Sequence, residues 1–339
     1  KGKHESLYTI CDECGFIGGK RLLKERLLYP SIDPVVLQKR YDKVEACMKD
    51  DFYTQLKDNM GKLSDTERSL RKMGLGVLGR DGFLNTKLSY DFIIRILNTL
   101  QGNSELSEMY SEYSEHLQTF RKFHNHIHEL FNFKNFMKPD EPYFNTGVYD
   151  ELDTVAQTIH DSKYHLECIC KRLSNIIDPK KGGCKFDKND KIGYFLYCTK
   201  NRSKTLINRF KNIPDHCINI RDDKGDIIHK LACDSFTFST KDGSNVFVET
   251  PEIKQLTKQL AVSSVKIKEL NEMYWAETMN SIYKDYKDVL LSVHNFVSDL
   301  DVACSSAKVS IQYKYSKPQL IENEKSCLVA KEIRHPIVE

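Results

Sequence analysis

The stretch TMNSIYKDYKDVLLSVHNFVSDLDVACSS, residues 278–306, lies within a longer segment, residues 252–317, that has neither glycine nor proline. Its apolar side chains recur at steps of three and four residues over several turns: Met279, Ile282, Tyr286, Val289, Val293, Phe296, Leu300 and Ala303. This heptad-like spacing predicts a continuous helix of roughly 50 residues, about 75 Å long at 1.5 Å per residue. Such a length is typical of a lever or a coiled-coil arm.

A second segment upstream has the same spacing. Its apolar positions, with Ser162 as the one polar break, are Leu152, Val155, Ile159, Leu166, Ile169, Leu173 and Ile176. The segment runs into DPKKGGCKFDKND, residues 178–190, where Pro179, Gly182 and Gly183 would stop a helix. Two long helices with matching apolar stripes can pack as an antiparallel pair, and we expect that arrangement here.

The residues between the two stripes have a different composition. Residues 191–199, 235–240 and 245–250 are rich in β-branched and aromatic side chains, which predicts strands. Asp242 and Gly243 form a plausible hairpin turn between the last two strands, and Thr250 and Pro251 form a plausible N-cap and first position of the long helix. The sequence therefore predicts a small antiparallel β module inserted between two long helices.

The first 145 residues are predicted to form helices with short connections. Ser64 to Glu67 has the pattern of a capping box, with Ser64 as the N-cap, and residues 102–123 have helical spacing of apolar side chains. The predicted fold is mainly α. Its expected parts are a helical core (1–145), an ascending helix (146–190), a β-rich module (191–250), a descending helix (251–320), and a linker or first strand of a further domain (321–339).

The composition indicates a soluble globular protein, with 40% hydrophobic and 29% charged residues among 339. No apolar run approaches the roughly 18 residues that span a bilayer, and the first residues, KGKHESLYTI, do not resemble a signal peptide. The eleven cysteines are therefore expected to be reduced thiols of an intracellular protein. The missing initiator methionine suggests part of a longer protein. The net charge is only +3, so any basic surface must be confined to one part of the chain.

Six motifs, in order along the chain, resemble the MutS family of DNA mismatch-recognition ATPases. The opening GKRLLKERLLYPSIDPVVLQKRYDKVEA resembles the start of the family's core domain, and SDTERSLRKM, residues 64–73, resembles a helix of that core. GYFLYCT (193–199) and TPEI (250–253) are similar to the entry and exit of the family's clamp. SDLDVACSSAKVS (298–310) is similar to the end of the lever helix, and RHPIVE (334–339) to the entry into the ATPase domain. The matching core residues are Gly19, Arg21, Leu22, Leu23, Leu27, Pro30, Arg40, Val44, Asp65, Glu67, Arg68 and Leu70, with Lys72 in place of an arginine.

This resemblance implies a helical core, lever helices and a β clamp, which agrees with the periodicity. It implies that the mismatch-reading domain would precede Lys1 and that the nucleotide site would follow Glu339. We therefore expect this chain to be non-catalytic and to hold no cofactor or metal, whereas ATP and Mg²⁺ would act in the full-length protein. The implied partners are double-stranded DNA, mismatched or branched, and a second MutS-like subunit in a homo- or heterodimer, with no membrane.

The chain departs from the family pattern at three places. Phe16 and Arg26 stand where the family often has threonine and tryptophan. The exit from the clamp keeps Lys241 but lacks the arginine that usually follows it, which removes one expected phosphate contact. These departures suggest a divergent subfamily.

The strongest candidate for binding is KNRSKTLINRFKN, residues 200–212, which has five cations and no carboxylate. Such a stretch suits contacts with phosphates, and nothing in it resembles a helix that reads bases. The predicted DNA-backbone-binding residues are Lys200, Arg202, Lys204, Arg209, Lys211 and Lys241. Two alternatives remain open, namely a solvated basic loop and a helical scaffold that binds another protein. Asp222, Asp223 and Asp226 follow closely and would weaken a positive face.

Four other patterns are expected to be structural. GFIGGK, residues 15–20, has the wrong spacing for a phosphate loop. Cys11 and Cys14 have the spacing of half a zinc site, but His165, Cys168, Cys170 and Cys184 are distant in sequence and would not all share one helix face. HNHIH (His124, His126 and His128) has a spacing suited to a strand but lies in a helical context, and it is expected to be a solvated His-rich turn. Trp275, Tyr274, Tyr283 and Tyr286 are expected to pack between helices.

Overall fold

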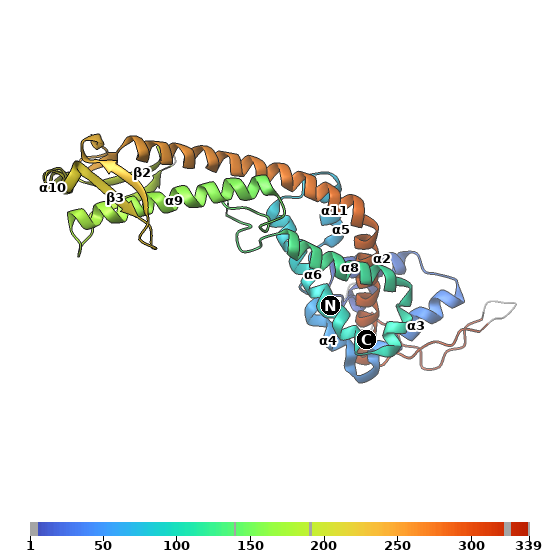
Figure 1. Cartoon of the computed structure of the whole chain (residues 1–339). Coiled ribbons are helices and arrows are strands. Elements are labelled where there is room, and N and C mark those ends of the chain that lie inside the picture. Colours follow the sequence, from blue (N-terminus) through green and yellow to red (C-terminus); the bar gives the residue numbers. More distant parts are fainter. Residues whose placement is uncertain (1–5, 139, 190–191, 322–326, 338–339) are drawn as a thin grey trace. The chain divides into compact units, whose positions relative to one another are not determined.

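The computed structural model describes residues 6–138, 140–189, 192–321 and 327–337. The chain divides into two compact units (Figure 1). Unit 1 comprises Lys1–Glu129 and Ala276–Glu339, and unit 2 comprises Leu130–Trp275. The predicted strand start at Lys191 and the ends at Lys1 and Glu339 lie outside the described residues. Residues 327–337 contain bends and a turn, without the strand expected there.

Unit 1 is helical. Its elements are α1 (Leu7–Cys11), α2 (Ile17–Leu28), α3 (Pro34–Met48), the 3₁₀ turn η1 (Lys49–Asp51), α4 (Phe52–Met60), α5 (Thr66–Gly74), α6 (Arg80–Gln101), α7 (Ser104–Met109), η2 (Ser111–Tyr113), α8 (Ser114–Leu130) and the second part of α11 (Pro251–Tyr313). The predicted long helix is thus confirmed, and at 63 residues it is longer than expected.

The core of unit 1 is built around α11. Every residue from 296 to 305 is buried, so that this part of the helix has no solvent-facing side. The predicted apolar stripe supplies Val293, Phe296 and Leu300, each at most 1% exposed. Tyr110 packs edge-on against Phe296 with ring centroids 5.2 Å apart. A helix buried all round must also satisfy its polar side chains inside the protein.

Asp301 on α11 satisfies this requirement by anchoring the segment before α2. The backbone N–H groups of Gly15 and Phe16 donate to Asp301 Oδ1 and Oδ2 at 3.0 and 2.9 Å. The first turn of α2 then lies directly against α11: a β-carbon on Gly19 would lie 2.9 Å from Asp301 Cβ and Cγ, and closer still to Oδ2. Gly19, one of the family-like positions, is therefore required by close helix packing.

Unit 2 combines helices with two small sheets. Its elements are α9 (Asp150–Ile177), β1 (Cys184–Asn189), β2 (Gly193–Thr199), α10 (Lys200–Phe210), the 3₁₀ turns η3 (Pro214–His216) and η4 (Cys233–Ser235), β3 (Cys217–Arg221), β4 (Ile227–Ala232), β5 (Thr237–Thr240), β6 (Asn245–Glu249) and the first part of α11. Within this unit, α9 and the first part of α11 run side by side in opposite directions (Figure 1). Lys266 on α11 pairs with Glu151 at the start of α9 at 3.0 Å.

The larger sheet is antiparallel in the order β1-β2-β6-β5, and β3 and β4 form a separate hairpin. Leu196 on β2 faces Val248 on β6, and Phe238 on β5 faces the same Val248. The turn at Asp242 and Gly243 joins β5 to β6 as predicted. Thr250 caps α11, because its hydroxyl accepts the N–H of Ile253 at 3.2 Å.

Aromatic side chains fill the other end of unit 2, where the loop 131–149 folds onto α11. Trp275 is 8% exposed and lies 5.8 Å from Phe131 and 5.6 Å from Phe136, centroid to centroid. Asn271 holds the loop, because its Oδ1 accepts the N–H of Tyr143 at 3.1 Å and its amide donates to the carbonyl of Glu141 at 3.0 Å. Trp275 is buried as expected, but the aromatic rings it packs against belong to this loop.

Several details differ from the sequence-based predictions. The N-cap of α5 is Asp65, which accepts the N–H of Arg68 at 3.1 Å, whereas Ser64 instead bonds to Ser89. The helix predicted over residues 102–123 breaks at Tyr110 into α7, η2 and α8. Strands β1, β3 and β4 were not predicted. The basic stretch follows a strand as expected, but it is the helix α10 within the module predicted to be β-rich, which excludes the alternative of a basic loop.

We predict that Gly19→Ala destabilises unit 1 by about 1–3 kcal/mol, because the added methyl group overlaps the carboxylate of Asp301. The measurement is urea unfolding followed by circular dichroism. Gly79→Ala is the matched control, since a β-carbon there meets no atom within 4 Å. Equal midpoints for the two variants would show that the contact between α2 and α11 is not tight.

A second prediction concerns pH. Burial raises the pKa of Asp301 to about 6, although the hydrogen bonds from Phe16 and Gly15 act in the opposite direction. The folded state therefore binds the proton more tightly than the unfolded chain, whose aspartate pKa is about 3.9, so this group stabilises the fold at low pH and loses that contribution as pH rises through 6. The stability of Asp301→Asn relative to wild type should increase by about 2–3 kcal/mol from pH 4 to pH 7.

The check is the free energy of unfolding of both proteins across this range. Asp288→Asn makes the same substitution at an exposed position of the same helix and controls for the loss of one carboxylate. A difference between Asp301→Asn and wild type that does not vary with pH would contradict the assignment.

Candidate nucleic-acid interface

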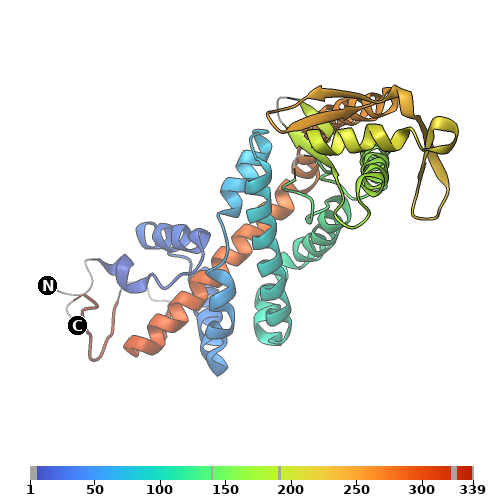
Figure 2. The same cartoon turned by 90° about the vertical axis from the view of Figure 1, so that its left-hand side faces the viewer.

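The predicted basic stretch folds as an amphipathic helix on the surface of unit 2. Thr199 at the end of β2 caps α10 by accepting the N–H of Arg202 at 3.4 Å. Ser203, Leu206 and Phe210 are the buried side of the helix, which packs on β2, β6 and α9 (Figure 2). Phe210 lies 4.8 Å from Phe236, centroid to centroid. These anchors fix the direction in which the cations project.

Four of the six predicted contact residues form one set, which we call the α10 strip: Lys200, Arg202, Lys204 and Lys211. Lys200, Lys204 and Lys211 are exposed, and Arg202 is partly exposed. In the part of the chain that the structure describes, none of the four side chains forms an ion pair. The first turn of α10 has no acidic residue. Cations are disfavoured near a helix N-terminus, so this arrangement favours a bound anion.

Arg209 has a structural role instead. Its Nη1 donates to the carbonyl oxygen of Ile176 at 2.6 Å, in the last turn of α9. The last carbonyl groups of a helix have no partner within the helix, so Arg209 caps α9 from α10.

Lys241 is likewise engaged within unit 2. Its Nζ lies 4.5 Å from the ring centroid of Tyr197 and 5.3 Å from that of Phe195, and 3.6 Å from the carboxylate of Asp242. The turn that carries Lys241 is nevertheless next to the α10 strip, because the N–H of Lys200 donates to the carbonyl of Ser244 at 3.0 Å. The structure thus brings Lys241 near the strip but turns its charge toward aromatic rings.

Three neighbouring carboxylates, those of Asp222, Asp223 and Asp242, have partners other than the α10 strip. Asp223 pairs with Lys171 on α9 at 3.6 Å, and its N–H donates to the hydroxyl of Tyr164, also on α9, at 3.1 Å. Asp222 accepts the N–H groups of Lys224 and Asp226 within its own turn. Hydrogen bonds from Asn245 and Ser244 lower the pKa of Asp242. Each carboxylate therefore already has partners of its own.

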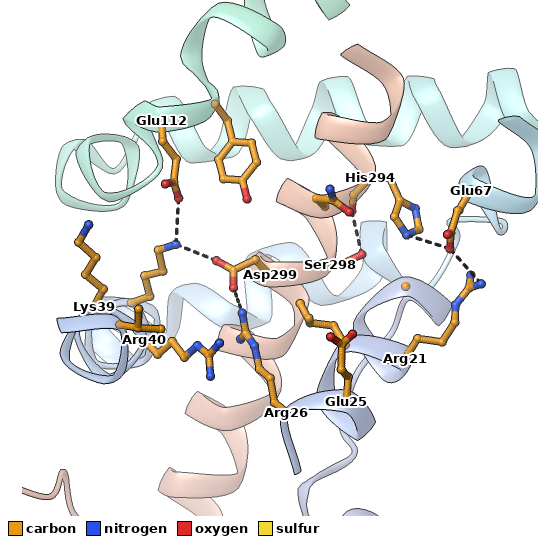
Figure 3. Close-up of a pocket in the computed structure, with 16 residues that line it drawn as sticks. Arg21, Glu25, Arg26, Lys39, Arg40, Glu67, Glu112, His294, Ser298 and Asp299 are labelled. Carbon is orange, nitrogen blue, oxygen red and sulfur yellow. Dashed lines mark hydrogen bonds and ion pairs between the residues drawn. The ribbon is translucent and has the colours of Figure 1, made fainter. Parts of the chain in front are cut away.

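Unit 1 contains a charged pocket of about 570 Å³ between α2, α3 and α11 (Figure 3). Asp299 lies at its centre and pairs with Arg26 and, at 2.7 Å, with Lys43. Burial would raise the pKa of Asp299, but the charges of Arg26 and Lys43 outweigh burial and hold it below its usual value. Arg21 at the rim pairs with Asp65 and Glu67 at 2.6 and 3.1 Å. The pocket is thus largely an internal ion-pair network.

The two departures from the family pattern near α2 both contact α11. Arg26 is the partner of Asp299 just described. Phe16 is fully buried and packs edge-on against His294, with centroids 5.2 Å apart. Burial lowers the pKa of His294, which favours the neutral form of the ring. These departures change packing in the core.

The structure also locates the glycine-rich stretch and the side chains that could hold a metal ion. Gly18 and Gly19 of GFIGGK lie in α2 against Ser298 and Asp301, which leaves no room for a phosphate. The ten cysteines from Cys11 to Cys304 are free thiols. Among the described residues, the one set of three or more side chains placed to share a metal ion is Asp91, His124 and His128. Neither Cys11 nor Cys14 belongs to it.

Two features of these sites were missed from the sequence. Leu206 and Phe210 have helical spacing behind a threonine N-cap, a signal that could have identified α10. The stretch HNHIH was expected to be a solvated turn, although its helical context was recognised. It lies in α8, where His124 and His128 are one turn apart. The expectation of a solvated turn was wrong.

The comparisons with known proteins agree with the motifs. The family model described as MutS domain III matches residues 1–307. A putative DNA mismatch repair protein, mutS homolog L359 of Acanthamoeba polyphaga mimivirus, is 26% identical over 99% of this chain and 31% of its own length. The DNA mismatch repair protein MutS of Petrotoga mobilis is 23% identical over 99% of this chain and 37% of its length.

A mitochondrial DNA mismatch repair protein, the mutS homolog of Sarcophyton glaucum, is 24% identical over 100% of this chain and 33% of its length. The chain therefore spans about a third of the length of these relatives. None of the helices in the described part of the chain is both long enough and apolar enough to cross a membrane.

We predict that Arg209→Ala lowers the stability of unit 2 by about 1 kcal/mol, because it leaves the carbonyl of Ile176 without its charged donor. Lys211→Ala removes a neighbouring exposed cation that has no such bond and should change stability little. Thermal unfolding of both variants provides the measurement. If both variants lose the same stability, Arg209 does not act as a cap.

Proposed function

The chain belongs to the MutS family, and from this premise we propose that unit 2 binds the sugar-phosphate backbone of duplex DNA through the α10 strip. The observation that carries the proposal is a set of four cations on α10 and at its C-cap that form no ion pair within the described chain; Lys200, Lys204 and Lys211 are exposed and Arg202 is partly exposed. Three of them lie in the first turns, where the helix dipole also attracts anions. A phosphate backbone would supply the missing negative charge.

Binding of this kind is independent of base sequence. Lysine acts as a point charge toward phosphate, and contacts with phosphate fix the position of a protein on the duplex without reading bases. Three of the four strip residues are lysines. Substitution of the strip residues should therefore weaken salt-sensitive binding equally on duplexes of unrelated sequence.

We further propose that α11 couples unit 2 to the rest of the protein. Its first part belongs to unit 2 and its second part to unit 1, and its residues from 252 onward include no glycine or proline. In this proposal the chain is a non-catalytic region. ATP and Mg²⁺ act in a part of the protein outside it, and the whole protein works as a dimer with a second MutS-like subunit.

We predict that the triple variant Lys200→Glu, Arg202→Glu, Lys204→Glu binds duplex DNA more than about tenfold more weakly at low salt. If all four strip cations meet phosphates, log affinity of the wild type falls with log salt at a slope of about −3.6, and the variant should retain about −0.9. The measurement is fluorescence anisotropy on two duplexes of unrelated sequence from about 50 to 200 mM salt.

The matched control is Lys24→Glu, Lys122→Glu, Lys258→Glu. It makes the same change in net charge at exposed positions of α2, α8 and α11. Glutamates in the first turns of α10 favour the helix dipole, so the strip variant should be no less stable than wild type, and lost binding cannot be ascribed to unfolding. Equal loss in both triple variants would indicate a net-charge effect only. Wild-type indifference to DNA at low salt, with capture of a protein through α10, would favour the scaffold alternative.

A further inference from the structure

Two helices of unit 1 bring three metal-ligand side chains together. His124 and His128 are one turn apart on α8, and their ring centroids lie 4.8 Å apart. Asp91 projects from α6 toward both. Its Oδ1 lies 2.8 Å from His124 Nε2 and 3.5 Å from His128 Nε2. One ligand atom from each residue lies within 4.8 Å of the other two.

These distances are close to those of a tetrahedral zinc site. With bonds of about 2.0–2.2 Å to imidazole nitrogen and carboxylate oxygen, ligand atoms of a tetrahedral site lie roughly 3.4 Å apart. The separations of 2.8 and 3.5 Å from Asp91 bracket that value, and the histidine nitrogens, within 4.8 Å of each other, would reach it by side-chain rotation. Both histidines are on one rigid helix, and the carboxylate is on its neighbour, which is the arrangement that holds a metal site in shape.

We propose that Asp91, His124 and His128 bind one divalent transition-metal ion, for which Zn²⁺ is the fitting probe, and that the ion ties α8 to α6. Two imidazoles and one carboxylate are a ligand set that zinc accepts, with the fourth position left to water. The side chain of His128 is 41% exposed, so solvent can reach that position, whereas those of His124 and Asp91 are 15% and 24% exposed.

Lys87 sets a limit on the affinity of this site. Its Nζ lies 2.7 Å from Asp91 Oδ2, the oxygen that the histidines do not face. The ion would therefore bind at Oδ1 while Lys87 stays on Oδ2. Repulsion between the two cations lowers the affinity, but it does not occupy the ligand atoms. The role of the ion is to fasten two helices, and it is separate from the DNA-binding role proposed for α10.

The test is titration of Zn²⁺ into the whole chain under reducing conditions, with calorimetry and thermal unfolding as readouts. Wild type should bind one equivalent that raises the unfolding temperature. His128→Ala should lower the affinity for this zinc ion by at least about 10- to 100-fold. Removal of a group that only supports a metal ligand has an effect of this size, so removal of a ligand should cost no less. This variant keeps the bond between Asp91 and His124 and is expected to fold.

His126→Ala is the control, since His126 is on the same helix, between the proposed ligands, and outside the set. It should bind zinc as wild type does. Cysteines could also take up zinc, and that uptake would be the same in wild type and in His128→Ala. Equal stoichiometry, affinity and thermal shift in these two proteins would overturn the proposal, as would a wild type that binds no zinc.

Discussion

The complete burial of residues 296–305 of α11 is the constraint from which the arrangement of unit 1 follows. A helix with no exposed side cannot place polar groups toward water, yet this segment contains Ser298, Asp299, Asp301 and Ser305. Each must find a partner on a surrounding element. Ser305 shows how this occurs, because its hydroxyl donates to the carbonyl of Cys11 at 2.8 Å and accepts the N–H of Glu13 at 2.9 Å. The segments around α11 are held by such bonds as well as by apolar contact.

Asp299 and Asp301 show two solutions to the same problem. They are two residues apart on one buried helix, but Asp299 is paired with two cations whereas Asp301 accepts two backbone N–H groups. Opposite charge offsets burial more fully than neutral donors do, so the pKa of Asp299 is lowered and that of Asp301 is raised. Arg26, which departs from the family pattern, is therefore best understood together with Asp299. A tryptophan at this position could not supply the charge.

The sequence predicted those parts of the fold in which one physical signal dominates. Long apolar stripes and the absence of glycine and proline identified α9 and α11, and β-branched runs identified β2, β5 and β6. The edge strand β1, CKFDKN, was missed because its side chains are mostly exposed and polar. In β3, Ile218 and Ile220 do alternate as a strand requires, but five residues are a weak signal. α10 was not predicted because only two apolar residues, Leu206 and Phe210, indicate a helix within a run of cations.

The candidate site could be predicted by residue type but not by role, because role depends on contacts between distant segments. Arg209 and Lys200 have similar sequence surroundings, yet the first caps α9 across 33 residues of sequence and the second points outward. Lys241 appeared to extend the basic surface, whereas Tyr197 and Phe195 hold its charge. The structure thus divides six cations into four that form no ion pair among the described residues and two that support the helix and the turn beside them. In the proposed interface both kinds are needed, since the four charges of the strip act together only where the supporting residues fix their positions.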